Sequence, residues 1–327
     1  MICLCGRTIY NNIQRLVCFS YDRWLQFAEV LYREISACST FHSMIQSLFR
    51  PEVSSAVNLL RSRFADFLGD VKLNDNNAQE DADFLTSEGI LSKPNPAQPY
   101  YRISSPMVDE LIRNRLIPAR FPNAPSTPVP LQERTGDVDV LGMLVESLKF
   151  FDKSLILAAS SCSHKRPKVK TNSSHGRHVP RESVYDTELM RILANWLRTC
   201  EWSVHGQWHL KDDSKRYKYS DIVLKNDIQP WQTILLELLA TGEPSSVESH
   251  IQKTLEHARL LSANEAWVVH FTREEDYNPI WPSEALSKIV NVVHFAHDPG
   301  FTSVVMNACW KDCAGEMQEV QKSLLLN

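Results

Sequence analysis

Between residues 183 and 310 the hydrophobic pattern switches between the period of a helix and the period of a strand, and this order constrains the fold most. Apolar residues recur at helical spacing over 186–197. Strand-like segments follow at 202–210, 217–224 and 233–240, then an amphipathic helix at 246–261 and strands at 266–271 and 290–295. The sequence therefore predicts an α+β (α/β) domain with the order α-β-β-β-α-β and one additional strand.

The part of the chain before residue 121 has a different character. Apolar residues at three- and four-residue spacing predict a mainly helical region over 1–78. Residues 79–120 have the pattern of a helix, a short strand, a proline-rich turn, a strand and a helix, and Ser105 and Pro106 are suited to start that last helix. This order predicts a winged-helix-like module. A simple hairpin between the helices of a helical domain is the alternative.

Residues 121–182 are expected to connect this region to the domain at 183–310, and 311–327 to form a tail. Five prolines between 118 and 130 indicate a linker, a helix is expected at roughly 137–159, and a second linker at 160–181 contains no acidic residue. A short basic run there is typical of a nuclear-import signal or of an arm that contacts phosphates: Lys165, Arg166, Lys168 and Lys170. A solvated charged loop is the alternative.

Composition excludes several classes of protein. The chain has 327 residues and a formal net charge of −4, so it is not a globally basic nucleic-acid coat protein. No apolar run reaches the roughly 18–20 residues that span a bilayer, so we expect no membrane partner. No charged segment precedes an apolar one at the N-terminus, and no signal peptide is recognisable. The 8 cysteines are irregularly spaced, which favours reduced thiols.

Two acidic residues lie inside predicted apolar strands. Asp221 is followed by Ile-Val-Leu, and Glu237 interrupts an otherwise apolar strand. A carboxylate is expensive to bury without compensation, so one such residue predicts a strand end and two on neighbouring strands predict a site. Paired carboxylates bind hard divalent cations such as Mg²⁺, which polarise phosphates and activate water. We therefore expect Asp221 and Glu237 to bind Mg²⁺ or Mn²⁺.

This pattern resembles the PD-(D/E)XK, or restriction-endonuclease-like, superfamily, which has an α-β-β-β-α-β core. The resemblance implies that Asp221 is the motif aspartate and Glu237 the motif glutamate. It also implies an acid on the first helix, for which Glu188 is chosen before Glu182 or Glu201. Leu239 occupies the position of the motif lysine.

A substitute for that lysine is expected on the helix at 246–261. At 100° per residue His250 and Gln252 flank its apolar face, whereas Lys253 points further outward. We therefore choose His250 or Gln252, and not Lys253, as the residue that orients water or phosphate.

Longer phrases resemble the C-terminal nuclease-like domain of Crinkler proteins of arbuscular mycorrhizal fungi. The resemblance covers roughly 80–310 and is most specific over 179–303. The phrases that carry it are Val179–Leu193, Tyr219–Leu224, Leu236–Gly242, Ser262–Thr272 and Val290–Phe295, followed by His297, Asp298, Phe301 and Thr302.

The Crinkler resemblance implies an effector-type protein that acts on DNA, or with host or own nuclear proteins, in the nucleus. The chain has no G-x-x-x-x-G-K-[ST] motif, so the family's NTPase core is missing and no nucleotide cofactor is expected. Residues 1–70 are then a remnant of the helical end of that NTPase. Two functions remain open: a metal-dependent DNA endonuclease, and a catalytically inactive module of the same fold that binds DNA or protein. A fragment that folds without function is a third reading.

A zinc site is a rival interpretation for three pairs of residues. His205 and His209, His294 and His297, and Cys309 and Cys313 have spacings that zinc sites use. The first pair would lie about 13 Å apart along a strand, and neither of the others has an obvious second pair. We therefore do not expect zinc. Trp231 and Trp281 fall in predicted loops and are expected to pack at the surface, with base stacking as the alternative.

Overall fold

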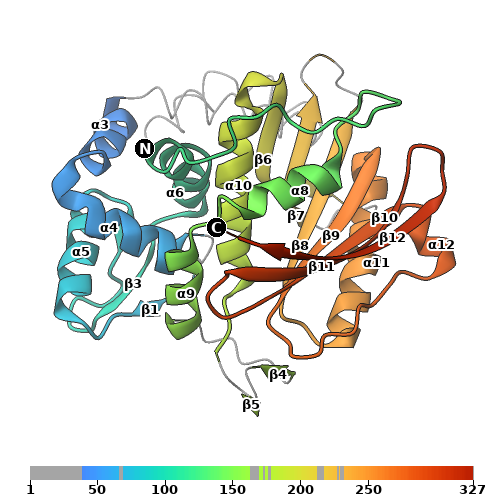
Figure 1. Ribbon diagram of the computed structural model, residues 1–327. Coiled ribbons are helices and arrows are strands. Elements are labelled where there is room, and N and C mark those ends of the chain that lie inside the picture. The colour runs from blue at the N-terminus through green and yellow to red at the C-terminus, as the bar shows by residue number, and fades with distance from the viewer. Residues whose placement is uncertain are drawn as a thin grey trace. The chain divides into compact units, whose positions relative to one another are not determined.

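The computed structural model describes residues 39–65, 69–162, 169–171, 174–175, 178–211, 217–226, 228 and 232–326. The chain divides into two compact units, Met1–Ile112 and Arg113–Asn327 (Figure 1). Helices and a mixed seven-stranded sheet are both present, so the predicted α+β class is confirmed. Within the described residues no helix combines the length and the apolar character needed to cross a bilayer.

The first unit combines helices with a three-stranded antiparallel sheet of order β1-β3-β2. Its elements are α3 (Ser39–Leu48), η1 (Pro51–Val53), α4 (Ser54–Leu59), the π-helical η2 (Leu60–Phe64), β1 (Val71–Lys72), α5 (Asn76–Ser87), β2 (Leu91–Ser92), β3 (Tyr100–Ile103) and α6 (Pro106–Leu111).

The order α5, β2, turn, β3 and α6 is the order expected for 79–120. The Ser105 hydroxyl accepts a hydrogen bond from the Val108 amide at 3.2 Å, and Pro106 occupies the first turn of α6, as its fixed φ favours. The sequence pattern therefore identified this start of a helix correctly.

The second unit is built on the seven-stranded sheet, whose order is β12-β11-β10-β9-β8-β7-β6. Its elements are α7 (Ile117–Arg120) after the π-helical η3 (Ile112–Leu116), then α8 (Val140–Leu148), α9 (Lys153–Cys162), β4 (Lys170–Thr171), β5 (Ser174–His175), α10 (Glu182–Trp196), η4 (Leu197–Thr199), β6 (Trp202–Lys211), β7 (Tyr217–Asn226), β8 (Thr233–Ala240), α11 (Pro244–Leu261), β9 (Glu265–Thr272), α12 (Glu284–Ser287), β10 (Val290–His297), β11 (Ser303–Lys311) and β12 (Met317–Leu325).

From α10 to β9 the unit has the predicted order α-β-β-β-α-β. The strands β6, β7 and β8 pair antiparallel, whereas β8, β9 and β10 run parallel. A parallel partner needs a crossover, and α11 makes the one between β8 and β9. Its last turn ends at Ser262, which adopts the left-handed conformation (φ 52°), the usual way of stopping a helix.

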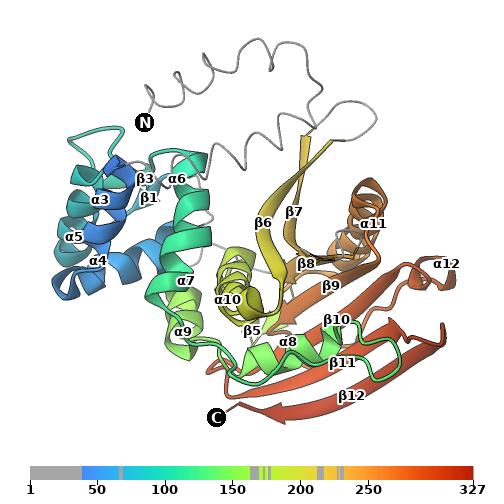
Figure 2. The same cartoon turned by 90° about the horizontal axis from the view of Figure 1, so that it is seen from above.

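Helices cover both faces of this sheet (Figure 2). On one face α8, α9 and α10 pack against alternate strand residues such as Leu236 and Val269. On the other, α11 packs through Val247, Ile251 and Leu255 against residues such as Val268. All eight residues of β8 are buried. A side chain from either face of β8 therefore lies away from bulk water.

Two segments differ from the predicted division. The expected linker helix is two helices, α8 and α9, whose apolar residues belong to the main core. The proline-rich segment before them is tied to α10, since the Arg191 guanidinium donates to the Phe121 carbonyl at 3.0 Å. Residues 317–325 of the expected tail form β12, which pairs with β11 along its length.

The predicted basic run falls mostly outside the described part of the chain. Lys165, Arg166 and Lys168 lie outside the described residues, and Lys170 lies in β4.

Candidate functional site

Asp221 and Glu237 are neighbours across two strands. In the β7–β8 register Ile222 lies opposite Leu236, so Asp221 and Glu237 occupy the next positions of the same ladder. Such cross-strand neighbours have Cβ atoms about 4.5–5.5 Å apart. The amide of Leu238 also donates to Oδ2 of Asp221 at 2.7 Å, which fixes that carboxyl group against β8. The sequence-based expectation of paired acids on adjacent strands therefore agrees with the geometry.

The carboxyl group of Glu237 is fully buried and is held by two side chains of α11. Nδ1 of His257 lies 2.7 Å from Oε1, and Nζ of Lys253 lies 2.9 Å from Oε2. An ionised carboxylate only accepts hydrogen bonds, so Nδ1 of His257 carries the proton that is shared with it. The ammonium approaches Oε2 outside hydrogen-bond geometry, which makes that contact an ion pair. The Lys253 ammonium thus balances the charge of Glu237. Oε2 accepts no hydrogen bond and keeps a lone pair that can coordinate a metal ion.

His250 completes the group. Among the described residues, Asp221, Glu237 and His250 form the group of acidic, histidine or cysteine side chains whose ligand atoms all lie within 4.8 Å of one another. Nε2 of His250 is buried and has no hydrogen-bond partner. An imidazole nitrogen and two carboxylates are a donor set that binds divalent metal ions, so this group can hold one.

Burial and the neighbouring charges shift the pKa values at this site. Burial, followed by the charge of Glu237, raises the pKa of Asp221 well above its ordinary value. Burial, followed by the charge of Lys253, lowers the pKa of His250 to about 4, which leaves its imidazole neutral at pH 7. Burial opposes the charge on Lys253, but Glu237 and Asp221 outweigh it and raise the pKa of that ammonium group. Lys253 therefore stays positively charged.

Two of the predicted site residues lie elsewhere. Gln252 is exposed on α11. Glu188 is fully buried in a different network, where Oε2 accepts from the Arg191 guanidinium at 3.0 Å and from the Asp152 amide at 2.9 Å. After burial and Glu237, the charges of two other acids of α10, Glu182 and Asp186, also raise the pKa of Asp221. The third candidate for the helical acid, Glu201, is exposed in the turn before β6.

Lys253 and His257 are the residues that the sequence reasoning missed. Lys253 does point further around α11 than His250, but its long stem reaches back to Glu237. His257 follows Lys253 by four residues, so both lie on one side of the helix. The signal available in the sequence was this spacing of basic groups at 250, 253 and 257, opposite a strand that buries an acid.

Of the rival zinc pairs, the His209 side chain lies outside the described residues. Among the described residues, neither His294 and His297 nor Cys309 and Cys313 belong to a group of three or more ligand atoms that could hold a metal ion. His294 instead makes hydrogen-bond contacts to His270 and Tyr277 at 3.1 Å, and its Nε2 lies 3.0 Å from the Ile280 carbonyl. The indole of Trp281 donates to Glu319 at 3.1 Å, as a surface packing role predicts, and Trp231 lies outside the described residues.

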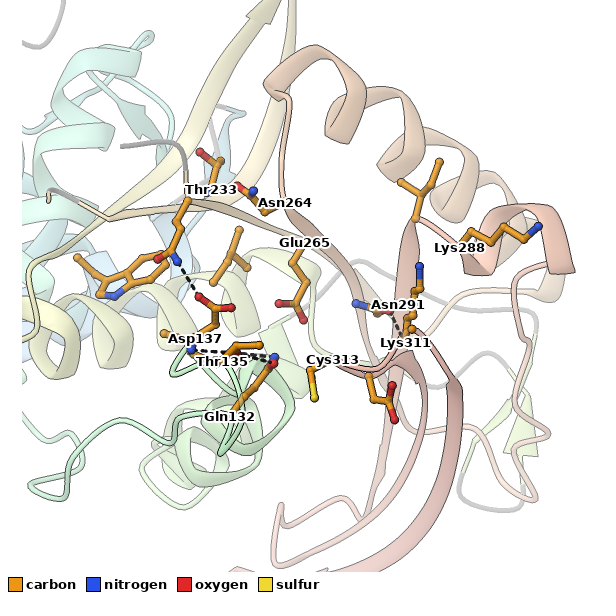
Figure 3. Close-up of a pocket in the computed structure, with 17 residues that line it drawn as sticks. Gln132, Thr135, Asp137, Thr233, Asn264, Glu265, Lys288, Asn291, Lys311 and Cys313 are labelled. Carbon is orange, nitrogen blue, oxygen red and sulfur yellow. Dashed lines mark hydrogen bonds between the residues drawn. The ribbon is translucent and has the colours of Figure 1, made fainter. Parts of the chain in front are cut away.

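A polar pocket of about 380 Å³ lies at the first residues of β8 and β9 and contains none of the paired acids (Figure 3). Asp137 and Glu265 point into it (Figure 3). Burial, aided by the charges of Asp139 and Asp137, raises the pKa of Glu265 to about 7, although the Trp267 indole donates to it at 2.7 Å. The pocket therefore contributes a carboxyl group that titrates near neutrality.

The comparisons with known proteins add no assignment. No protein-family model matches the chain, and no curated protein matches it. Any functional conclusion therefore depends on the residues and their geometry.

Proposed function

We propose that the unit Arg113–Asn327 is a metal-dependent nuclease domain that hydrolyses phosphodiester bonds in DNA. The observation that carries this proposal is the pair of buried carboxyl groups, Asp221 and Glu237, opposite each other beside the Lys253 ammonium. Two carboxylates buried together repel each other, and a bound cation relieves this repulsion when both are ionised. The unpartnered Nε2 of His250 is a further donor atom without a structural use.

Each side chain has a distinct role in this proposal. Asp221 and Glu237 hold a divalent cation, Mg²⁺ or Mn²⁺, which when bound polarises the phosphate and makes a neighbouring water more acidic. Lys253 stabilises the negative charge that builds up on the phosphate oxygens during attack. His257 is a positioning residue, because its hydrogen bond fixes the orientation of Glu237.

Lys253 also accounts for the apolar residue at the position of the motif lysine. Leu239 is buried in the cluster beneath α11 and carries no charge. Lys253 brings an ammonium group to the same glutamate from the following helix. In this proposal the Lys253 ammonium takes the place of the motif lysine of PD-(D/E)XK proteins, although it comes from a different position in the sequence.

A catalytically inactive DNA- or protein-binding module is the second candidate. The observation that favours it is the complete burial of Glu237, with one oxygen facing His257 and the other Lys253. In this alternative the acids and bases form a structural network only. The two candidates differ in whether the protein binds metal and cleaves DNA.

Nicking of supercoiled plasmid by the full chain with Mg²⁺ or Mn²⁺ tests the proposal. Asp221→Asn and Glu237→Gln should each lower the rate at least about 100-fold, as removal of a transition-state contact does. Glu248→Gln, which changes an exposed acid on α11, is the matched control and should nick as the unchanged protein does. DNA binding without nicking by the unchanged protein would establish the binding module. Nicking that survives both substitutions would refute the assigned site.

Nuclear action as a Crinkler-like effector is a further part of the proposal. Its support is the resemblance and the basic run Lys165, Arg166, Lys168 and Lys170. A fluorescent fusion of the full chain should accumulate in nuclei, and alanine at all four positions should abolish the accumulation. Equal nuclear signal from both fusions would refute this use of the run.

A further inference from the structure

We infer that His250 is a third metal ligand and that it makes this site selective for a transition-metal ion such as Mn²⁺ over Mg²⁺. The inference shares its residues with the proposed function and deepens it. Metal binding can be measured without DNA, so its failure is distinguishable from a failure of nuclease activity.

The unpartnered nitrogen of His250 is the first support. Nε2 is buried and has no hydrogen-bond partner. A neutral imidazole carries its proton on one ring nitrogen and keeps a lone pair on the other. With the proton on Nδ1, the lone pair of Nε2 is available to coordinate a metal ion.

The spacing of the donor atoms is the second support. The ligand atoms of Asp221, Glu237 and His250 all lie within 4.8 Å of one another. Two ligands on opposite sides of an ion, each about 2.1 Å away, are about 4.2 Å apart, so small side-chain movements bring all three atoms onto one ion. Asp221 and Glu237 come from neighbouring strands and His250 from α11, so the three approach from different elements.

A structural role for Nε2 is the competing explanation, and the contacts argue against it. A buried imidazole nitrogen without a partner loses hydrogen bonds that water would supply, which destabilises the folded state. His257, on the same side of α11, pairs with Glu237 and so incurs no such penalty. The structure thus uses one histidine of the helix to hold the glutamate and leaves the other facing both acids.

The chemistry of the donor set gives the selectivity. Mg²⁺ prefers oxygen ligands and releases its waters reluctantly. Transition-metal ions accept an imidazole nitrogen with an affinity that rises from Mn²⁺ along the series, whereas Mg²⁺ gains little from a nitrogen ligand. One nitrogen and two carboxylates therefore favour a transition-metal ion such as Mn²⁺ over Mg²⁺.

Electron paramagnetic resonance tests the inference, because the signal of free Mn²⁺ falls when the ion binds. The full chain is titrated with Mn²⁺, and Mg²⁺ is added as competitor. His250→Gln should weaken Mn²⁺ binding by at least about tenfold, in the range seen when a supporting group of a metal site is lost. It should leave the Mg²⁺ affinity unchanged. His42→Gln, which removes an exposed histidine of α3, is the matched control and should bind Mn²⁺ as the unchanged protein does.

The outcomes separate clearly. Equal affinity for Mn²⁺ and Mg²⁺, or a Mn²⁺ affinity that His250→Gln leaves intact, would overturn the inference, and so would the absence of any binding. Selective Mn²⁺ binding without plasmid nicking would uphold the inference and refute the nuclease. Circular dichroism of each variant checks that it is folded, and imidazole bound to Mn²⁺ gives nitrogen couplings in pulsed spectra that should disappear in His250→Gln.

Discussion

Nδ1 of His257 on α11 lies 2.7 Å from Oε1 of Glu237 on β8, and both side chains are almost completely buried. The attraction within a buried pair of this kind adds little to the free energy of unfolding, because burying the two groups is itself unfavourable. The loss of only one partner, however, is strongly destabilising. Removing one partner leaves a buried charge without compensation, whereas replacing both by apolar residues is often neutral. The connection between α11 and the sheet therefore depends on the two residues together.

This dependence predicts the effect of substituting His257. His257→Leu should lower the free energy of unfolding by about 3 kcal/mol, because it leaves the Glu237 carboxylate with Lys253 alone. The double variant His257→Leu with Glu237→Leu should regain most of that loss. Urea unfolding of the full chain, followed by circular dichroism, measures both. Losses that simply add would show that the two side chains do not act on each other.

Lys253 should matter for both activity and stability. Its side chain is 37% exposed, but its partner Glu237 is fully buried, so the pair is not a surface ion pair. Lys253→Met should therefore lower the free energy of unfolding, because the buried carboxylate loses its counter-charge. The nicking rate of the folded variant should fall about 100-fold, because a positive charge next to the phosphate is lost.

Lys218→Met provides the matched control for that measurement. Lys218 of β7 also forms an ion pair with a glutamate of α11, Glu256. Its removal should change neither the nicking rate nor the Mn²⁺ affinity. An equal loss of nicking in both variants would indicate a general electrostatic effect of the surface and not a role for Lys253.

Glu188 should prove structural. Its carboxylate compensates Arg191, whose side chain is nearly as buried. Glu188→Gln should therefore lower the free energy of unfolding by about 3 kcal/mol while leaving the Mn²⁺ affinity of the folded protein unchanged. Isothermal titration below the unfolding transition checks the affinity. A loss of metal binding in the folded Glu188→Gln variant would contradict this structural role and support Glu188 as the helical acid of the site.

The carboxyl group of Glu265 predicts a dependence of stability on pH. Its pKa is about 7 in the folded protein against an ordinary value of 4.5, so the folded state binds the proton more tightly than the unfolded state. The free energy of unfolding should therefore fall as the pH rises from about 4.5 to about 7. At 1.36 kcal/mol per pKa unit the fall is on the order of 1–3 kcal/mol.

Glu265→Gln isolates this contribution. The amide keeps an acceptor for the Trp267 indole and cannot ionise, so the variant should lose less stability than the unchanged protein over the same pH range. Urea midpoints at several pH values between 4.5 and 7.5 provide the comparison. Parallel curves for the two proteins would contradict the assigned pKa, and Glu248→Gln should give a curve that follows the unchanged protein.

The central strands were predictable because burial on one or both faces fixes their residue pattern. Strand β8 was expected and found at 233–240, since its apolar run has only one interruption. Strand β12 was not expected, because most of its residues are exposed and polar. Helices α8 and α9 were assigned to a linker because their own sequence does not show which other elements their apolar faces pack against.

The sequence could reveal only those site residues whose polarity conflicts with the residues around them in the chain. An acid within an apolar strand is such a conflict, and it identified Asp221 and Glu237. Helix phase alone could not find Lys253, because a projection at 100° per residue ignores the length of a side chain. It could not exclude Glu188 either, because the partner that compensates this acid, Arg191, is apparent only once α10 is buried.

The ion pair of Lys253 and the hydrogen bond of His257 with Glu237 also restrict how α11 can pack on the sheet. Apolar contacts such as those of Val247 and Ile251 tolerate small displacements, since one aliphatic side chain replaces another. A slip of one residue, however, turns the helix by about 100° and carries Lys253 and His257 away from Glu237. The carboxylate would then be buried without a counter-charge. The acid that we assign to catalysis thus gives the crossover from β8 to β9 a single alignment, and it enforces that alignment whether or not a metal ion is bound.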